Sequence, residues 1–275
     1  MSGAGGYSRP AIAGSGQIAC GLAAVASSAG EVRLLARSDA SAWRAEEAAE
    51  KLCGKLEGAV ARRVKVTTEP NDLADCDLIV EAIAEDMDAK AELIGRVGDV
   101  SAEADLASTT SSLPVTELGR RGGHPERLFG LHVFNPVTRM ELVELCLPDA
   151  VRPATAERAE AWCRALGKTP IRVPDEPGFV VNRLLFPYLF DAVRLLERTG
   201  MSAEDVDSCM SLGAGHPMGP LRLLDFVGLD VAQAIGDALY ADSGEAAHRP
   251  PGRLVELVGE GKLGRKSGAG FYEYG

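Results

Sequence analysis

Hydrophobic and polar positions follow two different periods over the first two thirds of the chain. Short apolar runs bounded by turn residues predict buried strands over residues 11–13, 32–35, 77–83, 105–108, 128–134, 142–146 and 170–173. Between them, apolar residues at helical spacing predict helices, among them 17–29, 87–100 and 154–166. Strands that alternate with helices are typical of an α/β protein with a parallel, doubly wound sheet.

The pattern changes after the segment VPDEPG. Apolar residues then recur at helical spacing, and no later run alternates like a strand; the first such set is Val181, Leu184, Leu185, Tyr188, Leu189 and Val193. We therefore predict a first domain over residues 1–173 and a smaller, all-helical domain over residues 174–275. Pro187 lies inside the first long helix of that second domain and should kink or interrupt it.

Composition and charge narrow the class of partner. The chain is 46% hydrophobic and 25% charged, and its formal net charge is −11, which argues against nucleic acid or an anionic membrane as a partner. Six cysteines occur singly, without a C-x-x-C pair, as expected of buried thiols in a reducing compartment. Four histidines show no zinc-ligand spacing, so we expect no metal.

We also expect a cytoplasmic protein. The first ten residues, MSGAGGYSRP, do not combine a charged start with an apolar segment as a secretion signal does. No apolar run approaches the length that a membrane-spanning helix needs, so a membrane is not an expected partner.

The segment GSGQIA, residues 14–19, follows a predicted strand and opens a predicted helix. Gly14 and Gly16 permit a tight turn and a close approach of a pyrophosphate, and Gln17 and Ile18 begin a helix whose amides face the phosphates. In this context the segment predicts a dinucleotide site on a Rossmann-type sheet. A turn with a purely structural role is the alternative.

The residues after the second strand bear on which dinucleotide is bound. Ala36 stands where NAD-preferring folds carry an acid, and Arg37 and Ser38 follow it. An acid there accepts hydrogen bonds from the ribose hydroxyls, whereas a guanidinium and a hydroxyl favour a 2′-phosphate. We therefore predict NADP rather than NAD. In the alternative, Arg37 stacks on adenine and Asp39 serves NAD.

The segment LHVFNPVTRMELVEL carries candidate acid/base chemistry. His132 lies at the end of one predicted strand and Glu144 lies on the next. A carboxylate bound to one ring nitrogen fixes the tautomer and stabilises the imidazolium, and the other nitrogen then exchanges a proton near neutral pH. A buried histidine with a satisfied hydrogen bond is the alternative interpretation of this segment alone.

Four further segments extend the pattern: ASTTSSL at 107–113, PGFVVNRLL at 177–185, GAGHPMGPLRLLDFVGLD at 213–230 and GKLGRKSGAGFYEYG at 261–275. With the segments above, they make nearly the whole chain similar to the L-3-hydroxyacyl-CoA dehydrogenase family, which includes the 3-hydroxybutyryl-CoA dehydrogenases. The resemblance implies an NAD(P)-dependent oxidoreductase of fatty acid metabolism. It would act on the 3-hydroxy/3-oxo position of a small-molecule acyl thioester, an acyl-CoA, and form a homodimer through its second domain.

The resemblance also implies roles for individual residues. His132 falls on the family's general acid/base and Glu144 on the residue that orients it, while Ser111 and Asn182 fall on residues that contact the substrate oxygen. The family's other cofactor contacts fall on Asn135, Ala82, Glu85 and Lys90. Because Asn182 comes from the second domain, the expected active site is the cleft between the two domains.

Two departures from the family pattern leave the substrate open. Arg139 is one of the residues that differ in the loop after His132, and it would meet either a substrate carboxylate or a pantetheine phosphate. The segment after the second strand is shorter than in the family, and its basic residues form either a phosphate patch or a solvated face. The alternatives are a relative that acts on a free hydroxy acid or an acyl carrier protein-bound substrate, and a non-catalytic dinucleotide-binding protein.

Overall fold

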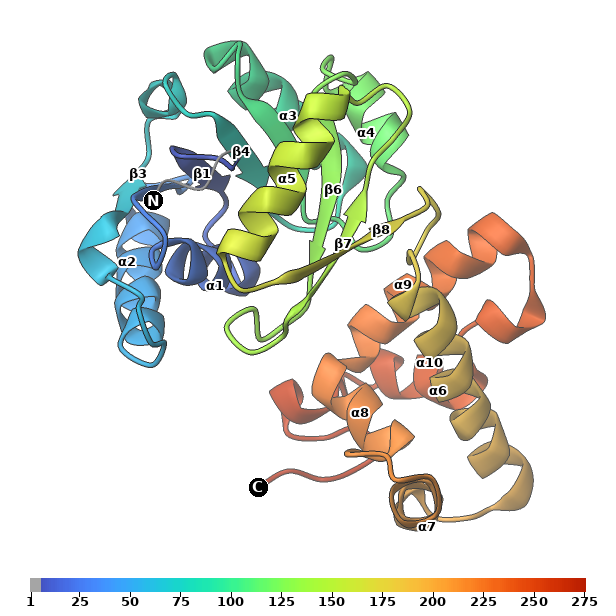
Figure 1. The fold of residues 1–275 in the computed structure, drawn as a ribbon. Coiled ribbons are helices and arrows are strands. Elements are labelled where there is room, and N and C mark those ends of the chain that lie inside the picture. Colours follow the sequence, from blue (N-terminus) through green and yellow to red (C-terminus); the bar gives the residue numbers. More distant parts are fainter. Residues whose placement is uncertain (1–5) are drawn as a thin grey trace. The chain divides into compact units, whose positions relative to one another are not determined.

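The computed structural model describes residues 6–275, so the first five residues of the segment searched for a secretion signal lie outside the described residues. Contacts along the chain divide it into two compact units, Met1–Glu176 and Pro177–Gly275 (Figure 1). The predicted division lies just before this one, within the segment VPDEPG.

The described part of the first unit is built on one eight-stranded sheet in the order β3-β2-β1-β4-β5-β6-β7-β8. The strands are β1 Pro10–Ala13, β2 Val32–Leu35, β3 Val64–Thr67, β4 Leu78–Glu81, β5 Asp105–Ser108, β6 Leu128–Val133, β7 Leu142–Cys146 and β8 Thr169–Val173. The helices are α1 Gln17–Ala26, α2 Asp39–Cys53, α3 Met87–Val100, α4 Val115–Arg121 and α5 Pro153–Ala165. Strands β2 and β3 lie on one side of β1 and strands β4 to β8 on the other, so the strand order reverses between β1 and β4.

The predicted doubly wound sheet is confirmed, and one strand pair near its edge departs from the predicted parallel arrangement. Strands β1 to β6 run parallel to their neighbours, but β7 is antiparallel to β6, and β8 is parallel to β7. The connection between β6 and β7, residues 134–141, is too short for the crossover that parallel neighbours need. The sequence pattern also did not predict the edge strand β3, a short run that contains a lysine.

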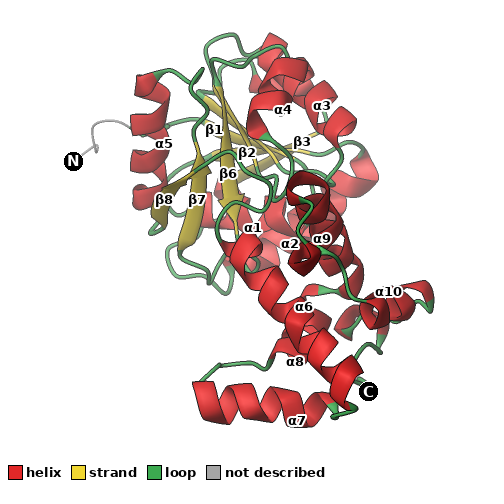
Figure 2. Ribbon diagram, turned by 90° about the vertical axis from the view of Figure 1, so that its right-hand side faces the viewer, coloured by secondary structure: helices red, strands yellow, loops and turns green. Residues whose placement is uncertain are grey.

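Alternation along the strands divides the buried side chains between two faces. One face packs against α1, α2 and α5, with strand residues Ile12, Leu34, Leu78, Val80, Ala107, Phe129, Leu131, Val133, Val143 and Leu145 in that core. Helices α3 and α4 lie on the other side of the strands from α5 (Figure 2). The strand positions between the core residues carry four buried polar side chains on this second face: Glu81, Ser108, His132 and Glu144.

The second unit is helical, apart from isolated bridges near its C-terminal end. Its α-helices are α6 Val181–Thr199, α7 Ala203–Ser208, α8 Pro220–Val227, α9 Leu229–Ser243 and α10 Gly252–Gly259. Helix α6 runs across Pro187 without an interruption, so of the two predicted effects only the kink stays a prediction. Phe186 and Leu189, on either side of the proline, are buried in the core of this unit. That packing offsets the roughly 3 kcal/mol that a proline costs inside a helix.

Within residues 6–275, no helix combines the length and the apolar character needed to cross a membrane.

Candidate active site

The turn after β1 requires glycine at its first position. Gly14 has a φ of +150°, and a Cβ atom added there would lie 2.2 Å from the carbonyl oxygen of Ala82, just past the end of β4. Its amide donates a 2.9 Å hydrogen bond to the carbonyl oxygen of Leu35 at the end of β2. Only a residue without a side chain therefore lets the ends of these three strands come so close together.

The next glycine leaves open space at a helix N-terminus. Gly16 is the N-cap of α1 and has no side chain to accept a hydrogen bond from the first-turn amides, which begin at Gln17 and Ile18. A Cβ atom added at Gly16 would meet no protein atom of the described residues within 4 Å. Exposed amides at the positive end of a helix dipole bind phosphate groups. This cradle therefore fits the pyrophosphate of a dinucleotide.

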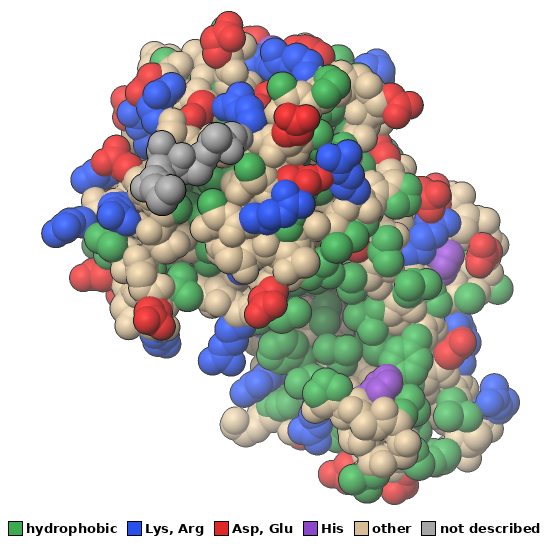
Figure 3. Space-filling model, viewed as in Figure 1, with side chains coloured by type: hydrophobic (Ala, Val, Ile, Leu, Met, Phe, Trp, Pro, Cys, Tyr) green, Lys and Arg blue, Asp and Glu red, His purple; other side chains and the backbone are tan. Residues whose placement is uncertain are grey.

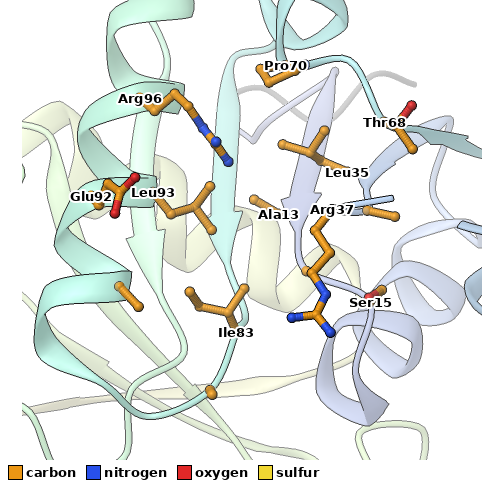
Figure 4. A pocket seen from close by; sticks show the side chains of 14 residues that line it. Ala13, Ser15, Leu35, Arg37, Thr68, Pro70, Ile83, Glu92, Leu93 and Arg96 are labelled. Atoms are coloured by element: carbon orange, nitrogen blue, oxygen red, sulfur yellow. The ribbon is translucent and has the colours of Figure 1, made fainter. Parts of the chain in front are cut away.

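Two adjoining cavities lie where the strand order reverses, between β1 and β4, the place at which open α/β sheets bind ligands. Their volumes are about 510 Å³ and about 410 Å³, and both are lined by Ser15, Arg37, Ile83 and Ala84. Ala82 lines the smaller cavity together with the glycine turn. In the larger cavity, Arg37 after β2 and Arg96 of α3 lie on different sides of a group of apolar side chains (Figure 4). An apolar slot of this kind suits a base ring.

The residues after β2 differ in what they present to the cavities. Ala36 is buried and lines the larger cavity, while Arg37 is exposed and lines both. The Ser38 hydroxyl accepts a 3.4 Å hydrogen bond from the amide of Ser41, and the Ser41 hydroxyl accepts one of 3.0 Å from the amide of Ser38. Ser38 therefore forms the capping box of α2. Asp39 begins that helix and lines neither cavity.

A buried ionic cluster follows β4. The Lys90 ammonium is 1% exposed and lies 2.8 Å and 3.0 Å from the two carboxylate oxygens of Glu81. It also lies 3.5 Å from Oε2 of Glu85. Burial alone would raise the pKa of Glu85, but the nearby ammonium and several hydrogen bonds outweigh it, so the pKa lies below its ordinary value. The predicted cofactor residues Glu85 and Lys90 thus contact each other.

Glu85 also holds the loop after β5. Its Oε1 accepts hydrogen bonds from the Thr110 hydroxyl and from the backbone amides of Ser111 and Ser112, at 2.8 Å, 2.8 Å and 2.9 Å. The Ser111 hydroxyl is a further donor at 3.2 Å. A carboxylate that accepts this many bonds fixes the backbone around it. The predicted substrate residue Ser111 and the predicted cofactor residue Glu85 are therefore parts of one network.

His132 and Glu144 occupy facing positions on antiparallel strands. They are register partners in the β6–β7 pair, and Nδ1 of His132 lies 2.7 Å from Oε2 of Glu144. Their exposed fractions are 6% and 1%. The Phe134 ring lies 4.5 Å from the imidazole, centroid to centroid. The contact matches the prediction, and it gives the imidazole the carboxylate partner that acid/base chemistry requires.

The loop between β6 and β7 carries two other predicted residues, Asn135 and Arg139, and both are exposed. The Lys168 ammonium donates hydrogen bonds to the carbonyl oxygens of Val137 and Met140, at 2.5 Å and 2.8 Å. Partial burial lowers the pKa of Lys168. These bonds tie the middle of the loop to the start of β8 and so fix the segment that carries both residues.

Asn182 belongs to the second unit, where it lies in the first turn of α6 and is 8% exposed. The residue that caps this helix is Val180, so Asn182 is not a capping side chain. The chain enters the helix through two residues with positive φ, Gly178 at 79° and Phe179 at 45°. Positive φ is unusual for an aromatic residue, and Phe179 is almost fully buried. This constrained turn fixes the point at which α6 begins, and so it fixes the position of Asn182 in the first turn of the helix.

Sequence reasoning missed several members of the network, chiefly Glu81, Ser108 and Thr110. One signal was available: Glu81 ends the otherwise apolar strand β4 and Ser108 ends its neighbour β5, both at the edge where ligands bind. A charged or hydroxyl side chain at such a position needs a partner when it is buried.

A phosphate cradle at the switch point and a buried histidine–carboxylate pair on the same sheet define the class, a dinucleotide-dependent oxidoreductase. Residues 10–176 match the family described as the NAD binding domain of 3-hydroxyacyl-CoA dehydrogenase, and residues 178–274 match its C-terminal domain. The chain belongs to the 3-hydroxyacyl-CoA dehydrogenase family.

Known relatives cover nearly the whole chain. A probable 3-hydroxybutyryl-CoA dehydrogenase of Deinococcus radiodurans is 40% identical over 274 residues, which is 96% of this chain and 99% of that protein. The 3-hydroxybutyryl-CoA dehydrogenase of Mycobacterium tuberculosis is 39% identical, covering 97% of this chain and 98% of that protein. The crystal structure of (S)-3-hydroxybutyryl-CoA dehydrogenase from Ralstonia eutropha has a TM-score of 0.92 at 34% identity, covering 98% of this chain and 99% of that one.

Proposed function

We propose that this protein transfers hydride reversibly between a nicotinamide dinucleotide and the 3-position of a 3-hydroxyacyl or 3-oxoacyl thioester of CoA. The observation that carries the proposal is the 2.7 Å contact between His132 and Glu144 at the ligand-binding edge of a dinucleotide fold. Oxidation of a carbinol requires a proton to leave its oxygen, and reduction requires one to return. The pair supplies that proton transfer.

Four residues of the chain have a defined task in the proposed reaction. Glu144 holds Nδ1 of His132 in one tautomer, and His132 exchanges a proton with the substrate oxygen through Nε2. The Ser111 hydroxyl turns its proton from Glu85 to the same oxygen and donates a hydrogen bond there as negative charge develops, while the Ser111 amide stays bonded to Glu85 and keeps the residue in position. We assign Asn182 a second donor role toward this oxygen, because it stands in the family segment G-F-x-V-N-R.

The dinucleotide, when bound, supplies the hydride donor or acceptor at its nicotinamide ring. The residues proposed to hold it are Gly14, Gly16, Gln17, Ile18 and Ala82 around the cradle, and Arg37, Ser38, Glu85, Lys90 and Asn135 beyond it. Lys90 is buried against Glu81, so we assign it an indirect role, exerted through Glu85.

We propose NADP as the preferred form of the cofactor. The exposed Arg37 lines both cavities, and Ala36 brings no carboxylate to the end of β2. A 2′-phosphate would be attracted to the guanidinium and would meet no acid at position 36. The Ser38 hydroxyl oxygen accepts from the Ser41 amide, and that bond leaves its own proton available as a further donor to the phosphate. NAD is the second candidate, because the matching family is described as an NAD binding domain.

The substrate class is proposed from the names of the relatives, several of which are 3-hydroxybutyryl-CoA dehydrogenases. A short 3-oxoacyl-CoA such as acetoacetyl-CoA is therefore the first substrate to test. We propose that Arg139, exposed on the β6–β7 loop, meets an anionic group of the substrate, either a carboxylate or a phosphate of the carrier.

The test is a spectrophotometric assay with acetoacetyl-CoA and either NADH or NADPH, in which turnover removes the absorbance of the reduced nicotinamide. Turnover with a CoA thioester supports the proposal. Turnover only with a free hydroxy acid, or only with a substrate bound to acyl carrier protein, would replace the substrate class. Dinucleotide binding without turnover of any alcohol or carbonyl would favour a non-catalytic binding protein.

We also propose a symmetric homodimer formed through the second unit. Hydrophobic side chains gather on the face of this unit seen in Figure 3, and the most exposed large ones in the unit are Leu184 at 70% and Leu212 at 88%. Exposed apolar surface of this kind is typical of an interface. Sedimentation at twice the chain mass of 28.9 kDa would support the dimer. A cytoplasmic location is proposed because all six cysteines are unpaired thiols.

A further inference from the structure

One buried carboxylate, that of Glu81 at the end of β4, contacts groups from three different segments. Its Oε1 accepts hydrogen bonds from the amide of Ile83 at 2.7 Å and from the Lys90 ammonium at 2.8 Å. Its Oε2 accepts one from the Ser108 hydroxyl at 2.5 Å and a second from Lys90 at 3.0 Å. The residue is 1% exposed, so these protein groups replace water around the whole carboxylate.

The first set of contacts leads to the cofactor cavities. Ile83, whose amide Glu81 holds, lines both of them. Lys90 also donates a 3.3 Å hydrogen bond to the carbonyl oxygen of Ile83 and lies 3.5 Å from Glu85. The position of this cavity wall therefore depends on a carboxylate that lines neither cavity itself.

The second set of contacts leads to the loop that carries Ser111. Ser108 ends β5, and its hydroxyl accepts a 3.3 Å hydrogen bond from the amide of Thr110. Glu85, which Lys90 holds by its charge, accepts the amide of Ser111 from the other side. The loop is thus held twice, and both routes begin at Glu81.

We propose that Glu81 is a positioning residue that sets the cofactor wall at Ile83 and the substrate donor Ser111 together. The inference rests on the proposed function, because it assigns Glu81 to the same dinucleotide and substrate site. Without the Glu81 charge, the Lys90 ammonium keeps only Glu85 as an anionic partner and draws it out of place. The loss of this one carboxylate therefore displaces both the segment after β4 that carries Ile83 and the loop after β5 that carries Ser111.

A matched control separates this role from a general contribution to stability. Asp105 is also 1% exposed and begins the neighbouring strand β5, at the opposite end from Ser108. It accepts hydrogen bonds from Tyr7 and Thr155 and pairs with two arginines. Replacing Asp105 therefore removes a buried carboxylate from the same sheet without changing the contacts of the Ile83 segment or of the Ser111 loop.

The experiment compares wild type with Glu81→Gln, Asp105→Asn and Ser108→Ala. Three quantities are measured: the Kd of the dinucleotide by nicotinamide fluorescence, kcat, and hydrogen exchange at the Ser111 and Ser112 amides in the protein without ligand. We expect Glu81→Gln to raise the dinucleotide Kd and to lower kcat. The two changes multiplied together should be about 10²-fold, since small displacements of reacting groups have effects of that size. Exchange at the two amides should become faster, and Asp105→Asn should change none of the three.

Ser108→Ala gives an independent test if Glu81→Gln does not fold. Because Ser108 leads only to the Ser111 loop, this variant should lower kcat and leave the dinucleotide Kd unchanged. The inference is wrong if Glu81→Gln keeps all three quantities at wild-type values, or if Asp105→Asn reproduces its losses. It is also wrong if Ser108→Ala leaves kcat unchanged. Absence of turnover in wild type would remove the proposed reaction, whereas Kd and hydrogen exchange would still test Glu81.

Discussion

The carboxylate of Glu144 lies directly across an antiparallel strand pair from the imidazole of His132, with Oε2 2.7 Å from Nδ1. The two residues are twelve positions apart in the chain. Because β6 and β7 are joined by a short loop, this spacing makes them register partners on the same face of the sheet. A strand pair holds both backbones rigidly, so the carboxylate can orient the ring without any flexible segment between them.

Replacing His132 with alanine should lower kcat by about 10²–10⁴-fold, the usual contribution of a general acid or base. The dinucleotide Kd should stay close to wild type, because His132 lines neither cavity. Steady-state kinetics and fluorescence titration measure the two quantities. A variant with nearly full activity would remove the acid/base assignment.

Changing Glu144 to glutamine should lower kcat by about 10²-fold or more, because a neutral amide neither fixes the tautomer nor stabilises the imidazolium as a carboxylate does. Glu141 gives a matched control, since it is an exposed glutamate just before β7. Glu141→Gln should retain kcat. Equal rates in the two variants would contradict the orienting role of Glu144.

Ala36→Asp should shift the ratio of kcat/KM for NADPH and NADH toward NADH by about tenfold or more, since a hydrogen bond to a charged group contributes about 1.5–3 kcal/mol. The new carboxylate would accept bonds from the ribose hydroxyls and repel a 2′-phosphate. Ala40→Asp places the same charge at an exposed position of α2 and should leave the ratio nearly unchanged. An unaltered ratio in Ala36→Asp would refute the account of Ala36 and Arg37.

Because of Glu85, the free energy of unfolding should depend on pH. Burial raises its pKa, but Lys90 and the hydrogen bonds from Thr110, Ser111 and Ser112 lower it more, so the folded pKa lies below the ordinary 4.5. A lowered carboxyl pKa stabilises the fold above about pH 4.5, and this stability is lost as the pH falls through the folded pKa. Urea unfolding of wild type and Glu85→Gln should therefore differ most near neutral pH and converge in acid. A difference that does not change with pH would contradict the paired state of Glu85.

Much of the fold could be predicted from local patterns. The strands at 32–35, 105–108 and 142–146 and the helix at 87–100 were predicted with the bounds that the structure has. Apolar runs and helical spacing indicate directly which side chains are buried. Such elements can therefore be predicted without knowing which other segments pack against them. The continuation of α6 through Pro187 could not be predicted this way, because packing around Phe186 and Leu189 outweighs the local preference.

The sequence by itself determined the glycine turn, the alternation of strands and helices, and the choice of His132 and Glu144 as partners. These features depend on residue type and spacing within one short segment. Tertiary structure alone decided the contacts of Glu81 with Lys90 and Ser108, which are 9 and 27 positions away from Glu81. The physical reason is that contacts between strands and helices depend on which strands become neighbours in the sheet, and no single segment of the chain records that order.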